Sequence, residues 1–339
     1  MVSVSVLNWN GQKFLKVCFE SIFKQTYPEI ELIVIDNASS DNSVEFIKVN
    51  YPQVKLIENR KNLGFSGGHN LGIRESKGNF VICLNPDVIM TPNFVSKLVE
   101  VAEGDKKVGA VTGKLIWSSF EEIGTGKKSN IIDSTGHIIF KDRHVLDRGQ
   151  GEKDQRQFEN QVEVFSVCGA AAMYRRKALE DAKINGEYFD EDMFAYKEDI
   201  DMGWRLHLLG WKCVYAPKAS AYHARGWGVK GKKQGFFDKF RYFKIKQARK
   251  SASPFLKYLS FRNRHIMMIK NELPLLFLKH LPWILFYEFG IFFYACFFER
   301  ESFKAIPEIL RLWPKLWQKR REIMARRKIG AREMERWFR

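Results

Sequence analysis

Asp87 is the first residue whose setting suggests chemistry. It belongs to the segment Asn85-Pro86-Asp87, which directly follows the apolar run 80–84. A carboxylate at the end of a buried strand can hold a hard divalent cation, and the phosphate oxygens of a ligand can fill the remaining coordination positions. The same carboxylate could instead cap the helix expected to begin near Pro92. The residues alone leave both interpretations open.

A second acidic cluster lies at the start of a helix expected over 198–210. It contains Glu198, Asp199 and Asp201, and the first and last of these, three residues apart, share a helix face. Carboxylates at a helix N-terminus often only stabilise the helix dipole. A carboxylate presented at the rim of a site can also act as a general base, which takes a proton from an attacking hydroxyl.

Three further features could contact a phosphorylated ligand. Asp36 follows the apolar run 32–35 and could accept hydrogen bonds from a nucleotide base or ribose, or simply form a local turn. The glycine-rich segment 64–68 would let a phosphate approach the backbone ahead of a helix, although both common phosphate-binding fingerprints are missing. His223 gains weight as a ligand only if it converges on Asp87, because a lone histidine is more often structural.

These residues need a scaffold, and strands and helices are expected to alternate through the first hundred residues. The expected strands are 4–7, 32–35, 54–57 and 80–84, and the expected helices are 12–25, 42–50, 67–76 and 91–103. Such alternation is typical of a doubly wound α/β sheet, in which ligands bind beyond the carboxyl ends of the strands. The polar residues that follow the four strands should therefore line one rim.

The pattern is weaker in the next hundred residues. The expected strands are 108–116, 131–140, 162–167 and 213–215, the expected helices are 176–182 and 198–210, and an exposed loop is expected at 149–156. The five cysteines form no CxxC pair and lie among apolar neighbours, which indicates reduced core residues rather than a disulfide framework or a zinc site. A strand expected from residue 3 onward leaves no room for a signal peptide.

The segments that contain these residues follow one another in a definite order along the chain. They are Val-Leu-Asn-Trp-Asn-Gly at 6–11, Val-Ile-Asp-Asn-Ala-Ser-Ser-Asp at 34–41, Asn-Leu-Gly-Phe-Ser-Gly-Gly-His-Asn at 62–70, Leu-Asn-Pro-Asp-Val at 84–88, Phe-Asp-Glu at 189–191, Tyr-Lys-Glu-Asp-Ile-Asp at 196–201, and His223. Over residues 2–265 the chain resembles the family 2 glycosyltransferases, whose α/β fold is the Rossmann-like GT-A fold of nucleotide-diphospho-sugar transferases. Within that family it looks most like the bacterial rhamnosyl- and galactofuranosyltransferase branch.

This resemblance implies a binding site for a nucleoside-diphosphate sugar. The nucleotide-binding residues that it implies are Asn8, Trp9, Asp36, Gly64, Gly67, Asn70 and Asn85. Trp9 and the backbone around Asn8 would pack against a pyrimidine base, and Asp36 would hydrogen-bond that base. The loop 64–70 would border the ribose and the diphosphate.

The resemblance also implies a metal site and a catalytic base. Asp87 matches the last acid of the family's DxD motif, whose first position is Asn85 here, so that one carboxylate remains. His223 matches a position that completes the metal site in related enzymes, and an imidazole ligand favours Mn²⁺ over Mg²⁺. Asp199 matches the base that deprotonates an acceptor hydroxyl. The residues expected on the acceptor side are Glu198, Gly169 and Trp227.

The last third of the chain carries the whole charge excess. Residues 224–339 contain 28 Lys and Arg against 9 Asp and Glu, an excess of 19, whereas residues 1–223 contain 28 against 30. The apolar stretch 281–298 is short and polar for a membrane span, because it includes Pro282, Glu288 and Gly290.

An amphipathic pattern follows that stretch. Its apolar residues, at spacings of three and four, are Phe303, Ile306, Leu310, Trp313 and Trp317. The basic residues among or just after them are Arg311, Lys315, Lys319, Arg320, Arg321, Arg326, Arg327 and Lys328. This combination predicts a helix that lies in the interface of an anionic membrane surface, with a partner helix or a nucleic-acid surface as the alternatives.

The sequence thus predicts a GT-A domain over 1–225 and a basic, aromatic-rich, helical membrane-associating region over 226–339. We expect a metal-dependent inverting glycosyltransferase that uses Mn²⁺ or Mg²⁺. Its donor would be a nucleoside-diphosphate sugar, with dTDP-rhamnose the first candidate and UDP-sugars next. The acceptor would be a lipid-linked or cell-surface glycan, reached at the inner, cytoplasmic face of the cytoplasmic membrane.

Two other functions each match part of the sequence. A processive polysaccharide synthase carries a QxxRW motif after the catalytic acid and several membrane spans, whereas the segment 333–337 reads Glu-Met-Glu-Arg-Trp and lacks the glutamine. A nucleic-acid-binding protein with a degenerate sugar-nucleotide fold would fit the basic tail. No nucleic acid is expected as a partner, since the first 223 residues are nearly neutral and keep the candidate acids and the histidine.

Overall fold

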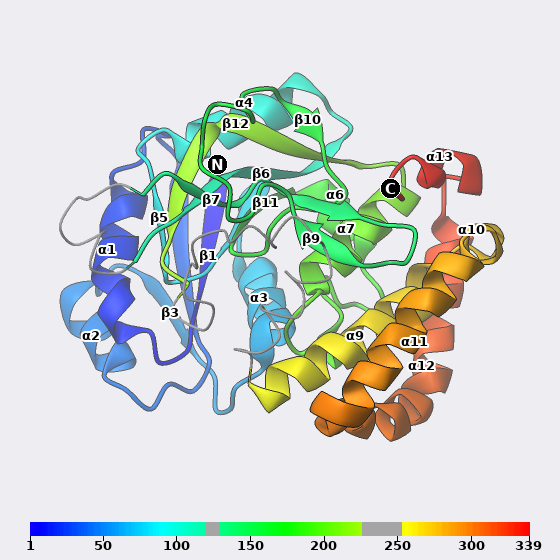
Figure 1. Cartoon of the computed structure of the whole chain (residues 1–339). Coiled ribbons are helices and arrows are strands. Elements are labelled where there is room, and N and C mark those ends of the chain that lie inside the picture. Colours follow the sequence, from blue (N-terminus) through cyan, green and yellow to red (C-terminus); the bar gives the residue numbers. More distant parts are fainter. Residues whose placement is uncertain (120–128, 226–252) are drawn as a thin grey trace.

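A mixed β-sheet with helices on both faces forms the centre of the molecule (Figure 1). The computed structural model describes residues 1–119, 129–225 and 253–339. Helices α1 (Gln12–Phe23), α2 (Ser43–Asn50) and α4 (Phe94–Gly104) pack on one face of the sheet. Helices α3 (Gly64–Glu75), α6 (Arg176–Ala182) and α7 (Glu198–Leu208) pack on the other.

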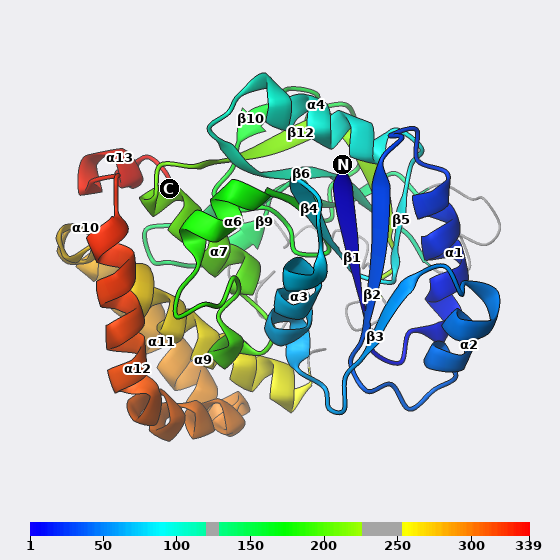
Figure 2. The same ribbon diagram turned by 180° about the vertical axis from the view of Figure 1, so that it is seen from behind.

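The N-terminal half of the sheet is parallel, as the alternation predicts. Its strands are β1 (Val2–Asn8), β2 (Ile30–Asp36), β3 (Lys55–Glu58) and β4 (Phe80–Leu84), in the spatial order β3-β2-β1-β4. Asn8 pairs with Asp36 and Asp36 with Glu58, so the carboxyl ends meet at one edge of the sheet (Figure 2). The prediction that the residues after these strands share a rim is confirmed.

The second half of the sheet is mixed and departs from the sequence prediction. Strand β11 (Ala171–Arg175) runs antiparallel between β4 and β6 (Val108–Trp117), and β12 (Lys212–His223) runs parallel to β6. The short strands are β5 (Val88–Met90), β7 (Ile131–Ser134), β8 (His137–Ile139), β9 (Val145–Asp147) and β10 (Val162–Glu163). Strand β12 is much longer than the predicted 213–215 and ends on His223 itself.

The predicted strand 131–140 is interrupted, and the predicted glycine loop is helical. Gly136, at φ +95°, separates β7 from β8. Residues 64–68 are the first turn of α3, which begins three residues earlier than predicted. A Cβ at Gly72 would lie 2.0 Å from the Ser5 Oγ, and one at Gly68 would lie 2.3 Å from the Leu7 Cδ1. The glycines therefore let α3 pack closely against β1.

Helices α9 to α13 form the C-terminal region beside α7 (Figure 1). They are α9 (Pro254–Asn271), α10 (Pro274–Lys279), α11 (Leu281–Phe298), α12 (Ala305–Arg326) and α13 (Ala331–Glu335), with a 3₁₀ turn at Arg300–Lys304 before α12. The Ser253 Oγ caps α9 by accepting a hydrogen bond from the Leu256 N–H (3.3 Å), and Pro254 occupies its first position.

The C-terminal helices share a hydrophobic core with the sheet-bearing part of the chain. Phe165 and Trp204 pack there with Ile266 of α9, Leu316 of α12 and Phe338. The backbone pairs as well, because the Arg339 N–H donates to the Ile139 carbonyl oxygen (3.1 Å) and the Lys141 N–H donates to the Arg339 carbonyl oxygen (3.0 Å). These contacts join the predicted regions 1–225 and 226–339 into one packed body wherever the structure describes them.

Candidate active site

Polar side chains from β1, β2 and the loop after β2 form a closed network at the carboxyl ends of these strands. The Asn8 Nδ2 donates to the Asp36 Oδ2 (2.8 Å) and to the Ser39 Oγ (3.1 Å). Asp36 also accepts from the Ser39 N–H (2.8 Å) and the Ser39 O–H (2.7 Å). The buried Asp36 carboxylate therefore stabilises the loop after β2, which agrees with the local turn that the sequence offered as one of its two roles. A role of Asp36 in binding a base stays a prediction.

Trp9 and the start of α3 border this network. Trp9 is 42% exposed and offers a ring on which a base could stack. Gly64 has φ +69°, its N–H donates to the Asn62 Oδ1 (2.8 Å), and its carbonyl oxygen accepts from the Asn37 Nδ2 (2.9 Å). Gly67 is buried one residue before the closely packed Gly68.

Asn70 is a predicted nucleotide-binding residue whose side-chain amide makes hydrogen bonds to other residues of the protein through both its nitrogen and its oxygen. Its Nδ2 donates to the Phe189 carbonyl oxygen (2.8 Å) and to the Glu191 Oε1 (2.9 Å), and its Oδ1 accepts from the Phe189 N–H (2.7 Å). Asn70 is completely buried and holds the segment that leads to η1 (Glu191–Met193). Its contact with nucleotide stays a prediction.

Asp87 and His223 converge, which is the condition that the sequence set for a histidine ligand. The His223 Nε2 lies 3.5 Å from the Asp87 Oδ1, and the His223 Nδ1 lies 2.8 Å from the Asp133 Oδ2. Burial opposes a charged imidazole here, but the Asp87 and Asp133 carboxylates outweigh it and raise the pKa of His223 to about 9. Asn85 directs its backbone N–H to the Ala170 carbonyl oxygen (2.9 Å).

Contacts continue from His223 towards the candidate base through residues that the sequence did not single out. Asp133 also pairs with the Arg225 guanidinium, which lies 3.8 Å from the Asp147 Oδ2. The His137 Nε2 lies 3.3 Å from the Asp147 Oδ1 and 3.9 Å from the Asp199 Oδ2. A continuous series of opposite charges thus joins the Asp87 end of the site to Asp199.

Two backbone groups orient Asp199. Its Oδ2 accepts from the Gly169 N–H (2.8 Å), and its Oδ1 accepts from the Ile200 N–H (2.8 Å). Burial lowers the pKa of His137, but the charges of Asp199 and Asp147 outweigh that effect and leave the pKa above its ordinary value. Asp199 therefore lies beside an imidazole whose charged form its own carboxylate favours, and beside a fixed amide donor.

The predicted acceptor-side residues have three different settings. Gly169 contacts Asp199 directly. Glu198 is buried, and that burial, with the neighbouring Asp199 charge, raises its carboxyl pKa well above the ordinary range. Trp227 lies outside the described residues. An acceptor-side role for any of the three stays a prediction.

The segment that delivers Asp199 is strained and is held by α9. Phe194, Tyr196 and Lys197 have φ of +61°, +73° and +70°, a region that non-glycine residues rarely occupy. The Nδ2 of the completely buried Asn263 lies 2.8 Å from each of the backbone carbonyl oxygens of Met193, Ala195 and Tyr196. One amide from the C-terminal region thus fixes the turn before the candidate base.

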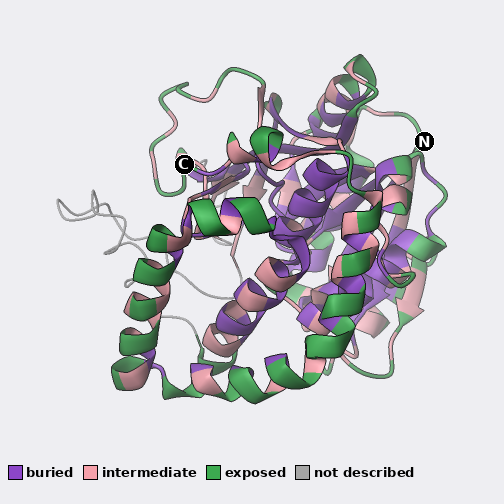
Figure 3. Ribbon diagram, turned by 90° about the vertical axis from the view of Figure 1, so that its right-hand side faces the viewer, coloured by how far each residue is buried: buried purple, intermediate pink, exposed green. Residues whose placement is uncertain are grey.

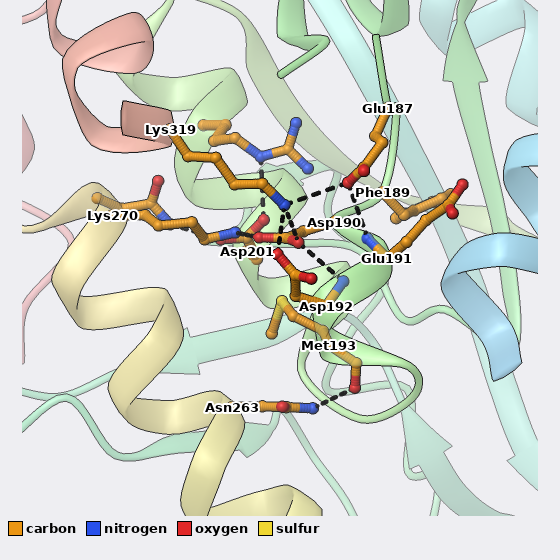
Figure 4. A network of polar contacts seen from close by, with 12 residues as sticks. Glu187, Phe189, Asp190, Glu191, Asp192, Met193, Asp201, Asn263, Lys270 and Lys319 are labelled. Atoms are coloured by element: carbon orange, nitrogen blue, oxygen red, sulfur yellow. Dashed lines mark hydrogen bonds and ion pairs between the residues drawn. The ribbon is translucent and has the colours of Figure 1, made fainter. Parts of the chain in front are cut away.

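A buried ionic cluster fastens α9 and α12 to the same segment (Figure 4). The Lys319 Nζ of α12 lies 2.5 Å from Asp190, 2.9 Å from Asp192 and 3.2 Å from Glu187. Lys270 of α9 pairs with Asp190 and lies 2.9 Å from Asp201, with which Arg205 also pairs. Burial opposes ionisation of Asp190, but the two lysines outweigh it and lower its carboxyl pKa. Lys319, counted among the membrane-facing charges in the sequence, is therefore a buried structural residue.

The donor set at Asp87 and His223 fits a divalent cation. Asp133 fixes the imidazole through Nδ1 and leaves Nε2 facing Asp87, which is the usual arrangement of a metal-binding histidine. His137, Asp147 and Cys168 also offer ligand atoms within 4.8 Å of one another. Burial raises the pKa of the Cys168 thiol well above its ordinary value and so disfavours the thiolate that a metal requires.

Four residues of the charged series escaped sequence analysis. Asp133, His137 and Asp147 lie in the stretch 131–147, where no clear periodicity marked them, and Arg225 follows the last strand. The one local signal for Asp133 was its position directly after the apolar pair Ile131-Ile132. The pairing of Asp133 with His223 spans 90 residues and arises from the fold.

The family model that describes glycosyl transferase family 2 matches residues 3–182, which is more than half of the chain. The chain belongs to glycosyl transferase family 2. A poly-beta-1,6-N-acetyl-D-glucosamine synthase of Staphylococcus epidermidis is 26% identical over 222 residues, which are 64% of this chain and 48% of the relative. The synthase of Staphylococcus aureus strain COL is 26% identical over 218 residues, 63% of this chain and 47% of the relative. The chain thus spans about half the length of these relatives.

Solved structures share the GT-A fold of this family 2 chain. GalNAc-T7 with UDP, GalNAc and Mn²⁺ superimposes with a TM-score of 0.57 at 15% identity, over 80% of this chain and 48% of that chain. Residues 1–349 of S. aureus TarS give 0.54 at 16%, over 96% and 88%. The mannosyltransferase PcManGT of Pyrobaculum calidifontis with GDP-Man and Mn²⁺ gives 0.51 at 15%, over 96% and 85%. The predicted fold class is confirmed.

Proposed function

We propose that this glycosyltransferase moves a sugar from a nucleoside diphosphate to an acceptor hydroxyl with inversion at the anomeric carbon. The observation that carries the proposal is the charged series that joins Asp87 and His223 to Asp199. One end can hold a divalent ion and a diphosphate, and the other presents an oriented carboxylate. Donor binding and proton removal require these two elements at one site.

In the proposed step, Asp199 accepts the proton of the acceptor hydroxyl as its oxygen attacks the anomeric carbon. A bond forms between that oxygen and the carbon, and the bond from the carbon to the β-phosphate oxygen breaks. The electron pair leaves with the nucleoside diphosphate. A divalent ion held by Asp87 and His223 would neutralise the charge that develops on this leaving group. The Gly169 N–H and the Ile200 N–H together fix the orientation of the Asp199 carboxylate.

The proposal extends to the metal, the nucleotide and the sugar. The imidazole ligand favours Mn²⁺ over Mg²⁺. Trp9 would stack on the base, and the Asn8–Asp36 network would shape the pocket beside it. UDP-N-acetylglucosamine is the first donor to test, because the relatives that are 26% identical are named as synthases of an N-acetylglucosamine polymer. dTDP-rhamnose, expected from the sequence resemblance, is the second.

The proposed acceptor is a lipid-linked or cell-surface glycan at the cytoplasmic face of the membrane. The basic and aromatic C-terminal region supports this choice, since an enzyme that lies on the membrane meets a lipid-linked acceptor there. A processive synthase is the second candidate, and the names of the relatives favour it. The length of the product distinguishes the two candidates. Mass spectrometry of the product would show the mass of one added sugar for a single transfer and a series of masses for a polymer.

The deciding experiment combines donor binding with turnover of an Asp199→Asn variant. Thermal unfolding is followed with UDP, dTDP, GDP and ADP, each with and without Mn²⁺, and we expect a metal-dependent stabilisation by a pyrimidine diphosphate. Asp199→Asn should keep that stabilisation and lose transfer by about 10²-fold or more. Asp201→Asn is an unsuitable control, because that residue pairs with Arg205 in the core. Glu45→Gln, in exposed α2, is the matched control. Turnover by Asp199→Asn at the rate of Glu45→Gln would refute the assignment.

A further inference from the structure

We propose that α10, α11 and α12 form one monotopic membrane-docking surface, in which α11 lies along the bilayer and does not cross it. The proposal deepens the proposed function and rests on it for the presence of a membrane-borne acceptor. Its own basis is the exposed apolar face of these helices together with the way in which both flanks of α11 are fastened to one domain.

The exposed face is long and almost entirely apolar. Figure 3, which views the molecule from the side of the C-terminal helices, shows the outer helices largely exposed. The exposed apolar residues are Leu275 and Leu278 of α10, Trp283, Leu285, Phe286, Phe289, Phe292, Phe293, Phe297 and Phe298 of α11, and Ile306, Leu310, Trp313 and Trp317 of α12. On α11 they cover most of the helix surface and leave Ile284 and Ala295 buried. On α12 their spacings of three and four place them along one side of the helix. Phe286 is 83% exposed and Phe297 is 75% exposed.

The charges and the side-chain types of this surface favour a lipid bilayer with anionic headgroups as its binding partner. Exposed basic residues flank the apolar sets at Arg300, Lys304, Arg311 and Arg321. The Trp313 and Trp317 rings stack with their centroids 6.4 Å apart, and tryptophan favours the boundary between hydrocarbon and water. A second copy of the chain would bring the same positive charges together, because residues 224–339 carry an excess of 19.

The attachment of the flanking helices excludes a crossing by α11. Its 18 residues would extend about 27 Å and pass for a span by length and composition. Helix α9, which precedes α10 and α11, is fastened to the catalytic part of the chain by Asn263 and Lys270, and helix α12, which follows α11, is fastened there by Lys319. A crossing would put these two helices on opposite sides of a hydrocarbon layer about 30 Å thick, away from the single domain that holds both.

The middle of α11 is also tied to the protein. The Glu288 Oε1 accepts from the Arg264 guanidinium of α9 (2.8 Å), and its Oε2 lies 3.3 Å from the His265 Nε2. A carboxylate halfway along a spanning helix would lie in the hydrocarbon core, where charged groups are strongly disfavoured. On the protein side of an in-plane helix the same carboxylate keeps its partners, and the phenylalanines face the acyl chains.

Labelling of cysteines at the two ends of α11 tests its orientation. Lys279→Cys and Lys304→Cys are introduced singly in a Cys296→Ser background, since the other four cysteines are buried. Inside-out membrane vesicles from expressing cells are treated with a membrane-impermeant maleimide. We expect both cysteines to react to the same extent without detergent. Reaction of one end only after detergent is added would show a span and overturn the proposal.

Sedimentation with vesicles tests the docking surface. Full-length Phe289→Ser/Phe293→Ser is compared with Phe23→Ser, which alters an equally exposed ring on α1. Binding to phosphatidylglycerol-containing vesicles should fall at least tenfold for the double variant and stay unchanged for Phe23→Ser. Equal binding of both variants would overturn the proposal. So would a concentration-dependent dimer in sedimentation velocity that the double variant loses, because the face would then bind a second copy.

The nucleotide panel on the same proteins keeps this result separate from the proposed function. Loss of vesicle binding with unchanged metal-dependent stabilisation by nucleotide is the expected outcome for the double variant. Wild-type protein that binds vesicles but no nucleotide would refute the proposed function alone. Wild-type protein that binds nucleotide but no vesicles would refute the docking surface alone.

Discussion

Lys319 should contribute more to stability than any surface lysine of α12, and Lys319→Met measures that contribution. The variant keeps the unbranched shape of the side chain, shortens it by one atom and removes its charge. Lys319 is completely buried and contacts Asp190, Asp192 and Glu187. Removal of one member of a buried ion pair destabilises a protein by roughly 3–5 kcal/mol, because the opposite charge stays buried. Asp190 keeps Lys270, so a loss of about 3 kcal/mol is expected.

Lys315→Met is the matched control on the same helix. Lys315 lies 2.7 Å from Asp192 and is 43% exposed, so its loss should lower stability by less than about 1 kcal/mol. The unfolding entropy of this 339-residue chain is roughly 0.7 kcal/mol/K. The unfolding temperature, followed by circular dichroism, should therefore fall by about 4 °C for Lys319→Met and by less than about 1.5 °C for Lys315→Met. Equal shifts for the two variants would refute the view that Lys319 fastens α12 to the catalytic segment.

Three further predictions concern the residues around the site. Asp133→Asn should weaken Mn²⁺ binding by about 10–100-fold, measured by electron paramagnetic resonance, because the His223 Nδ1 loses its carboxylate partner; unchanged affinity would remove Asp133 from the metal site. Asn263→Ala should lower kcat and change KM less, because the turn before Asp199 loses the hydrogen bonds from the Asn263 Nδ2 to three carbonyl oxygens. A change in KM alone would contradict a positioning role for Asn263. Asp190 has a lowered pKa in the folded protein, so its stabilisation is present above pH 4 and is lost as the pH falls below about 4. The unfolding temperature of Asp190→Asn should therefore fall less steeply with acid than that of wild type; parallel profiles would contradict this assignment.

The sequence predicted the parallel half of the sheet because its signals are local. Each apolar run near 4–7, 32–35 and 80–84 forms a buried strand, and the helix predicted over 176–182 has those bounds in the structure. Parallel strands place their carboxyl ends together, so the shared rim followed from alternation alone. The convergence of Asp87 and His223 was stated as a condition and is met at 3.5 Å.

Long-range contacts made the remaining features unpredictable. Asp133, His137 and Asp147 acquire their roles from partners far along the chain, and no local pattern marks such pairings. The amphipathic pattern of α12 correctly placed Leu310 and Trp313 on an exposed face. It could not reveal the opposite face, where Leu316 and Ile323 are buried in the shared core. Which charges of α12 face water depends on the acidic cluster around Asp190, which is separated from Lys319 by 129 residues.

The pairing of Phe338 and Arg339 with Ile139 has a consequence for the order of synthesis. Phe165 and Trp204 share their core with Phe338, so this core cannot close until Phe338 has emerged from the ribosome. The parallel strands can form during translation, whereas the segment that carries Asp199 must wait for α9 and α12. A nascent chain would therefore be inactive until α12 has emerged. The phenylalanines of α11 precede α12 in the chain, so they would be available to a membrane before the segment that carries Asp199 is fixed.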